Sequence, residues 1–76
     1  MNRITVDSKI HFGKPCIAGT RITVQSILEL LADGFSFKEI TQDYFPDLTN
    51  DDIRACIQYA IALVVSEDIH LSKLPV

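Results

Sequence analysis

The sequence predicts a mainly α-helical fold in which three helices follow a short N-terminal β element. Residues that cap helix N-termini occur at three places, and apolar residues follow them with the 3.6-residue period of a helix. The first 23 residues instead combine β-branched side chains with glycine and proline, as short strands and turns do. We expect one domain over residues 1–76, with a β segment at 1–23, three helices within 24–66 and a tail at 67–76.

Length and cysteine content are typical of a small protein with reduced thiols. The chain has 76 residues and two cysteines, with no secretory signal pattern at its start. We therefore expect a cytoplasmic protein whose thiols are free. The longest apolar run, AIALVV at 60–65, is far shorter than the roughly 18 residues that span a bilayer, so we expect no membrane insertion.

Charge is distributed unevenly along the chain, whose formal net charge is −3. Residues 1–24 carry four cations against Asp7 alone, a balance of +3, and residues 25–76 carry three cations against nine acids, a balance of −6. A basic N-terminal segment is typical of a surface that meets nucleic acid or an acidic partner, although a solvated charge distribution explains the pattern equally well. The four N-terminal cations are Arg3, Lys9, Lys14 and Arg21.

Two parts of the N-terminal region predict strands. Residues 3–6 alternate apolar and polar side chains, and residues 15–23 predict two short strands around a turn at Ala18-Gly19. Glycine adopts positive φ at little cost, which suits such a turn. The hairpin would place Ile17 and Ile22 near the core.

Two capping signals predict the first two helices. Thr23 is the expected N-cap of a helix that ends at Asp33-Gly34, where glycine can take the left-handed conformation after the last turn. Ser36 and Glu39 form a capping box for a second, shorter helix that ends near Phe45-Pro46. Its predicted inward face consists of Phe37, Ile40 and Tyr44.

The third predicted helix is apolar around most of its circumference. Thr49 and Asp52 form its capping box, and apolar residues occupy nearly every face from Ile53 to Val65. A chain of 76 residues offers little to cover such a helix, so we expect it to pack on another polypeptide, with a fully internal central helix as the alternative. The expected homodimer interface is formed by Ile61, Leu63, Val64 and Val65.

No set of side chains in the sequence predicts catalysis, a metal or a cofactor. Cys56 lies on the apolar stripe of the third helix and Cys16 in an expected strand, so both thiols are expected in the core. The two cysteines and two histidines lack the close pairs that zinc sites require. Helix capping explains the acids at 51–52, and the order G-x₄-G-K-[ST] of a P-loop is absent, because Lys14 follows the first glycine of the stretch. We therefore expect no enzymatic activity.

The second and third helices have the length pattern of a helix-turn-helix over residues 35–60. In that motif the start of the second helix of the pair enters the major groove of DNA. Asn50 and Arg54 are placed there to contact base edges, but Asp51 and Asp52 beside them would repel phosphates. A protein-interaction unit is therefore favoured over a strong DNA reader, and a basic contact would come from the N-terminal cations.

A set of short motifs spread over residues 4–62 resembles a known family. The motifs are Gly13-Lys14-Pro15, Gly19-Thr20-Arg21, Val24, Gly34, Glu39-Ile40, Pro46-Asp47-Leu48-Thr49 and Tyr59-Ala60. In this pattern and spacing the chain resembles the small bacterial and archaeal proteins of domain-of-unknown-function family 433. One departure is Ala18, since many members carry a basic residue immediately before Gly-Thr-Arg.

The resemblance implies a homeodomain-like or winged helix-turn-helix fold and a role as an antitoxin of VapB type. Such proteins are often encoded beside a PIN-like ribonuclease toxin, which they bind and block, and many also bind their own operator DNA as dimers. The acidic start of the third helix and the absence of a cation at 18 favour toxin binding over operator binding. A DNA-binding regulator without a toxin, and an interaction module with neither partner, are the alternatives.

Arg21 is the residue that we expect to meet the toxin. A guanidinium on a rigid turn can bind carboxylates or phosphates through two parallel hydrogen bonds. PIN-like nucleases hold metal with clustered carboxylates, so the resemblance implies that Arg21 could pair with them. The alternative is an ion pair between Arg21 and one of the nine downstream acids of its own chain. The predicted set of residues that bind a partner or nucleic acid is Lys14, Arg21, Arg3, Asn50 and Arg54.

Overall fold

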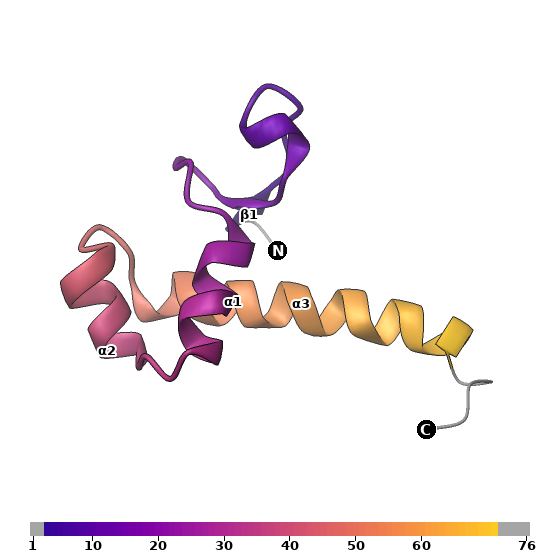
Figure 1. Ribbon diagram of the computed structural model, residues 1–76. Coiled ribbons are helices and arrows are strands. Elements are labelled where there is room, and N and C mark those ends of the chain that lie inside the picture. Colours follow the sequence, from indigo (N-terminus) through magenta and orange to yellow (C-terminus); the bar gives the residue numbers. More distant parts are fainter. Residues whose placement is uncertain (1–2, 72–76) are drawn as a thin grey trace.

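The computed structural model describes residues 3–71, and the side chains of residues 3–66 (Figure 1). Two short strands and a single 3₁₀ turn lead into the helical part of the molecule. The elements are β1 Ile4–Thr5, η1 His11–Gly13, β2 Cys16–Ile17, α1 Val24–Ala32, α2 Phe37–Glu39, η2 Ile40–Tyr44 and α3 Asn50–Leu71. The prediction of a mainly helical fold with a small N-terminal β element is confirmed.

The N-terminal β element is smaller than predicted. β1 and β2 pair antiparallel, with Ile4 opposite Ile17, and the strand predicted over 3–6 covers only β1. The predicted second strand of the hairpin is reduced to a single bridge between Cys16 and Thr23. The reason is local, because Thr23 already serves as the N-cap of α1 and the chain leaves the ladder there to coil.

α1 begins and ends with the predicted signals. The Thr23 hydroxyl accepts a hydrogen bond from the Ser26 N–H at 3.1 Å, as an N-cap does. Gly34 follows the last turn with φ +97°. The N–H groups of Gly34 and Phe35 then donate to carbonyls of that turn at 3.0 and 3.1 Å, which satisfies backbone acceptors that the helix end would otherwise leave open.

α2 starts at the predicted capping box. The Ser36 N–H donates to Glu39 Oε1 at 2.9 Å, and the Glu39 N–H donates to Ser36 Oγ at 3.1 Å. The helix then widens into the π-turn η2, in which the Phe45 N–H donates to the Ile40 carbonyl at 2.8 Å. Together α2 and η2 span the length predicted for the second helix.

The prediction that Tyr44 faces the core is wrong. A π-turn takes up more residues than an α-turn, so the position next to Ile40 on the inner face shifts from 44 to 45. Ile40 is fully buried and Phe45 packs against the core, whereas Tyr44 is 45% exposed. Tyr44 instead meets Phe35 edge-on at the surface, with 5.1 Å between the ring centroids.

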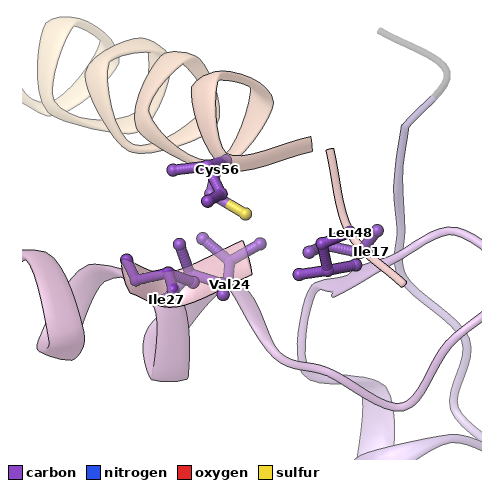
Figure 2. Close-up of a cluster of buried hydrophobic side chains, with 7 residues drawn as sticks. Ile17, Val24, Ile27, Leu48 and Cys56 are labelled. Carbon is purple, nitrogen blue, oxygen red and sulfur yellow. The ribbon is translucent and has the colours of Figure 1, made fainter. Parts of the chain in front are cut away.

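The core lies where α1 packs against the first turns of α3, and residues from β2 and from the loop before α3 complete it. Figure 2 shows Cys56 reaching from α3 towards Val24 and Ile27 of α1, with Ile17 and Leu48 beside them. These five residues are at most 5% exposed. Burial of an aliphatic side chain of this size stabilises a fold by roughly 1.5–3 kcal/mol. Together with Ile40 and Ile53, which are also fully buried, these residues form the core that stabilises the fold.

α3 is the longest element, with 22 residues. Its helical backbone continues to Leu71, past residue 66 where the sequence predicts a tail, and residues 72–76 of that tail lie outside the described residues. Neither α3 nor any other helix in the described part of the chain has the length and apolarity that crossing a membrane requires.

Candidate protein-interaction surfaces

The turn around Gly19 holds a guanidinium on a fixed hairpin. Gly19 has φ +79°, a conformation that a side chain would strain. The Thr20 hydroxyl donates to the Ile17 carbonyl at 2.8 Å and accepts from the Ile22 N–H at 3.0 Å. Both arms of the turn are thereby tied together next to Arg21, which is exposed. Thr20 thus satisfies backbone groups on both sides of the turn.

Arg3, rather than Arg21, pairs with the downstream acids. Arg3 Nη1 lies 2.9 Å from Asp52 Oδ1, and Arg3 Nη2 lies 3.8 Å from Asp51 Oδ2. Asp51 also contacts Arg54, at 3.2 Å. None of the ion pairs between side chains of residues 3–66 involves Arg21. The internal pair considered as the alternative for Arg21 is therefore not found in that part of the chain.

Asp52 is held in its ionised form at the start of α3. Burial by itself raises the pKa of this carboxyl, but the Thr49 N–H donates to it at 2.9 Å and the Arg3 guanidinium at 2.9 Å. The bonds outweigh the burial, so the pKa of Asp52 lies below its ordinary value of 3.8. The Asp52 N–H donates in return to the Thr49 hydroxyl at 3.3 Å, and the predicted capping box is thus present.

The start of α3 is electrically balanced. Arg3 and Arg54 both pair with acids of the first turn, and the remaining predicted residue there, Asn50, is exposed and uncharged. Binding to phosphates depends mainly on cations that are not already neutralised. The residues predicted to bind a partner therefore fall into two groups. Arg3, Asn50 and Arg54 lie together at the start of α3, whereas the exposed cations Lys14 and Arg21 lie elsewhere, in the N-terminal segment.

The second half of α3 extends away from the other elements (Figure 1). Four large apolar residues on it are 49–64% exposed. They are Ile61, Leu63, Val64 and Val65, the residues predicted to form a homodimer interface. We call them the apolar arm. The alternative of a fully internal helix is wrong, because the core covers α3 only near its start. Grouped apolar side chains of this kind mark surfaces that bind another molecule.

A groove of about 490 Å³ runs between α1 and α3. Apolar side chains of Val24, Leu28, Ala32, Tyr59, Ala60 and Leu63 form most of its lining. Lys14 and Glu29 also line it, and both are exposed. Leu63 belongs to both the groove and the apolar arm, so the two surfaces are continuous. The sequence does not predict this groove, because it depends on how α1 crosses α3.

Both cysteines are buried, as predicted, with exposures of 1% for Cys16 and 0% for Cys56. Burial raises the pKa of the Cys56 thiol to about 11, with a smaller contribution from the negative charge of Asp52. A thiol with this pKa is protonated at neutral pH and is a poor nucleophile there. The contribution of Cys56 is therefore to the packing of the core.

The sequence does not predict that Phe12 is an exposed aromatic residue with an unusual backbone conformation. This residue lies in η1 and is 99% exposed. It has φ +56°, between His11 at +48° and Gly13 at +84°. Positive φ is uncommon for a bulky residue, and such backbone is often found at functional positions. The available signal is an aromatic residue that belongs to no helical or strand period and stands next to a glycine.

The sequence matches the model of a protein family over residues 4–60. The family is described as a protein of unknown function (DUF433). The match covers both strands, α1, α2 and the part of α3 that packs on the core, and it ends just before the apolar arm. No curated protein and no solved structure matches the chain. The chain belongs to the DUF433 family.

Proposed function

We propose that this protein is a non-enzymatic antitoxin of VapB type. In this proposal a homodimer binds a PIN-like ribonuclease in the cytoplasm and blocks its nuclease site. The observation that carries the proposal is the apolar arm, whose large side chains are 49–64% exposed in a single chain. An exposed apolar helix face is stabilised when a second polypeptide covers it. The choice of a ribonuclease as the partner is supported by the resemblance in the Gly-Thr-Arg turn and in the helix spacing.

Arg21 supplies the contact that we propose with the ribonuclease. Its guanidinium is exposed on a turn that Thr20 fixes through two hydrogen bonds, so little backbone entropy is lost when it binds. A planar guanidinium binds a carboxylate through two parallel bonds. A cluster of metal-binding carboxylates in a nuclease would present that chemistry, and pairing with Arg21 would displace the metal.

DNA is supported less well as the main partner. The cations at the start of α3, Arg3 and Arg54, are neutralised by Asp51 and Asp52. Contacts between cations and the phosphate backbone supply much of the affinity of most DNA-binding proteins. A helix at whose start positive and negative charges are equal in number gains little binding energy from such contacts. Operator binding would then depend on Lys14 and Arg21 of the N-terminal segment.

The test begins with the reading frame beside the gene, where the proposal expects a PIN-like ribonuclease. The purified ribonuclease is titrated with this protein, and both RNA cleavage and binding heat are measured. We expect inhibition at the stoichiometry of binding. The Arg21→Ala variant should bind about 30-fold more weakly, because losing one desolvated charge pair costs about 2 kcal/mol.

The matched control is Lys38→Ala, which removes an exposed cation from α2 and should leave the affinity unchanged. An Arg21→Ala variant that binds as well as the unmodified protein would reject the role of Arg21. A ribonuclease that cleaves RNA at the same rate with and without this protein would reject the antitoxin role. Gel shifts at several salt concentrations test the regulator alternative, which predicts a sequence-specific complex that weakens steeply with salt.

A further inference from the structure

The groove between α1 and α3 carries one charge of each sign. Lys14 and Glu29 line it together with the apolar residues, and neither forms an ion pair with another side chain of residues 3–66. Glu29 Oε2 accepts a hydrogen bond from Gln25, another lining residue, at 3.2 Å. Both charges are therefore available to a molecule that lies over the groove.

The two charges lie at different positions along α1. The Val24 N–H donates to the Pro15 carbonyl at 2.9 Å, which places Lys14 and its neighbour at the beginning of the helix. Glu29 stands five residues further along, which corresponds to about 7.5 Å at the rise of 1.5 Å per residue. The groove thus has a cation near one end of α1 and an anion further along, and apolar side chains of α1 and α3 form most of the rest of its lining.

We propose that this groove is the surface on which two copies of the chain associate, with Lys14 of each copy paired with the partner's Glu29. A two-fold axis perpendicular to the groove reverses its direction, so the cation of one copy meets the anion of the other, twice. The apolar linings of the two grooves face one another between these pairs. The inference rests on the homodimer of the proposed function and names the surface and the ion pairs that form it.

A second copy carries the charges and the apolar strip that this groove requires of an occupant. Any occupant needs an apolar strip with an anion at one end and a cation at the other, at the spacing that the groove sets. The chain itself carries that arrangement on an exposed surface, so an identical copy satisfies the requirement without further assumptions. A domain of 76 residues also gains stability from association, because alone it buries a smaller share of its surface than a larger domain does.

Association through the groove uses one side of the apolar arm and leaves the other side open. Successive residues of an α-helix are rotated by about 100°, so Ile61 and Val65 lie on the side of α3 opposite Leu63. Leu63 lines the groove, whereas Ile61 and Val65 do not. The dimer would therefore cover Leu63 and leave Ile61 and Val65 for the ribonuclease of the proposed function.

A charge-exchange experiment tests the inference. Lys14→Glu and Glu29→Lys are made separately, and the mass of each variant is followed by sedimentation equilibrium over a range of concentrations. Each variant alone places like charges opposite one another, so its dimerisation constant should weaken by at least about tenfold. An equimolar mixture restores both opposite-charge pairs, so native mass spectrometry should show mostly heterodimers.

The mixing step separates pairing between copies from pairing within a copy, because a pair inside one chain gives no preference for heterodimers. Lys9→Glu and Asp47→Lys are the matched controls, since they make the same charge changes at exposed positions outside the groove lining. Circular dichroism checks that all variants remain folded. If neither groove variant weakens the dimer and their mixture shows no preference for heterodimers, the groove is not the dimer interface, although the homodimer of the proposed function stands. If the unmodified chain stays monomeric, both the groove interface and the homodimer are rejected. The ribonuclease titration would still decide the antitoxin role.

Discussion

Asp52 joins two parts of the chain that are 49 residues apart in sequence. Its carboxylate accepts from the N–H of Thr49, the residue directly before α3, and from Arg3, which lies beside β1. The Arg3 carbonyl in turn accepts from the Ala18 N–H at 2.7 Å. The N-terminal β element is therefore attached to the start of α3 through one side chain as well as through the core.

Removal of this carboxylate gives a pH-dependent loss of stability. The pKa of Asp52 is lower in the folded state than its ordinary value of 3.8, so ionisation favours folding. This contribution is fully present above about pH 5 and is lost as the pH falls through the folded-state pKa. We expect Asp52→Asn to lower the free energy of unfolding by roughly 1 kcal/mol at pH 7, and by much less in strong acid, measured by urea denaturation at one fixed protein concentration.

The control for this prediction is Asp47→Asn, which removes an exposed carboxylate from the loop before α3. It should change the free energy of unfolding by less than about 0.5 kcal/mol at pH 7. An Asp52→Asn variant whose deficit is the same at pH 7 and in strong acid would show that this carboxylate is not held ionised by its contacts.

The Thr49–Asp52 half of this arrangement is predictable from sequence, and the Arg3 half is not. A capping box depends on residues three apart, so its spacing is visible in the chain itself. Arg3 has nine downstream acids to choose from, and the local sequence carries no information about which of them folding brings near. The predicted binding role of Arg3 consequently overlooks the internal contact that the structure shows.

At the scale of helices and turns, local chemistry predicts where elements begin better than how they continue. All three N-caps, Thr23, Ser36 and Thr49, make the expected backbone bonds. The widening of the second helix into η2 is not predicted, because its residues show an ordinary helical pattern. The π-turn packs Phe45 against the core. A single added residue in one turn is sufficient to move Tyr44 to the surface.

The C-terminal end of α1 allows a test of backbone conformation separate from packing. Gly34 has φ +97°, and a Cβ atom there would meet nothing within 4 Å. Replacement by alanine therefore adds left-handed backbone strain without a steric clash. We expect Gly34→Ala to lower the free energy of unfolding by about 1 kcal/mol.

Asparagine tolerates this conformation better than alanine, so Gly34→Asn should lose less stability than Gly34→Ala. Both variants are compared with the unmodified chain by thermal and urea unfolding. Equal stability of the alanine variant and the unmodified chain would mean that the turn after α1 has another conformation in solution.

At the scale of the whole molecule, a compact helical core carries a helix that extends well beyond it (Figure 1). The exposure of the apolar arm could be predicted, because the composition of the third helix exceeds what so short a chain can cover. The groove with its two charges could not be predicted from the sequence, because Lys14 and residues of α1 and α3 come together only through the tertiary packing. The family match ends at residue 60, directly before the arm begins.

The mass of the unmodified protein in solution, measured by sedimentation equilibrium over a hundredfold range of concentration, tests most directly whether a second polypeptide covers the end of α3. We expect a species of twice the chain mass of 8.5 kDa, which dissociates into single chains on dilution. A constant mass of 8.5 kDa at every concentration would contradict the account, because the groove and the Leu63 side of the apolar arm would then remain in water with no second copy to cover them.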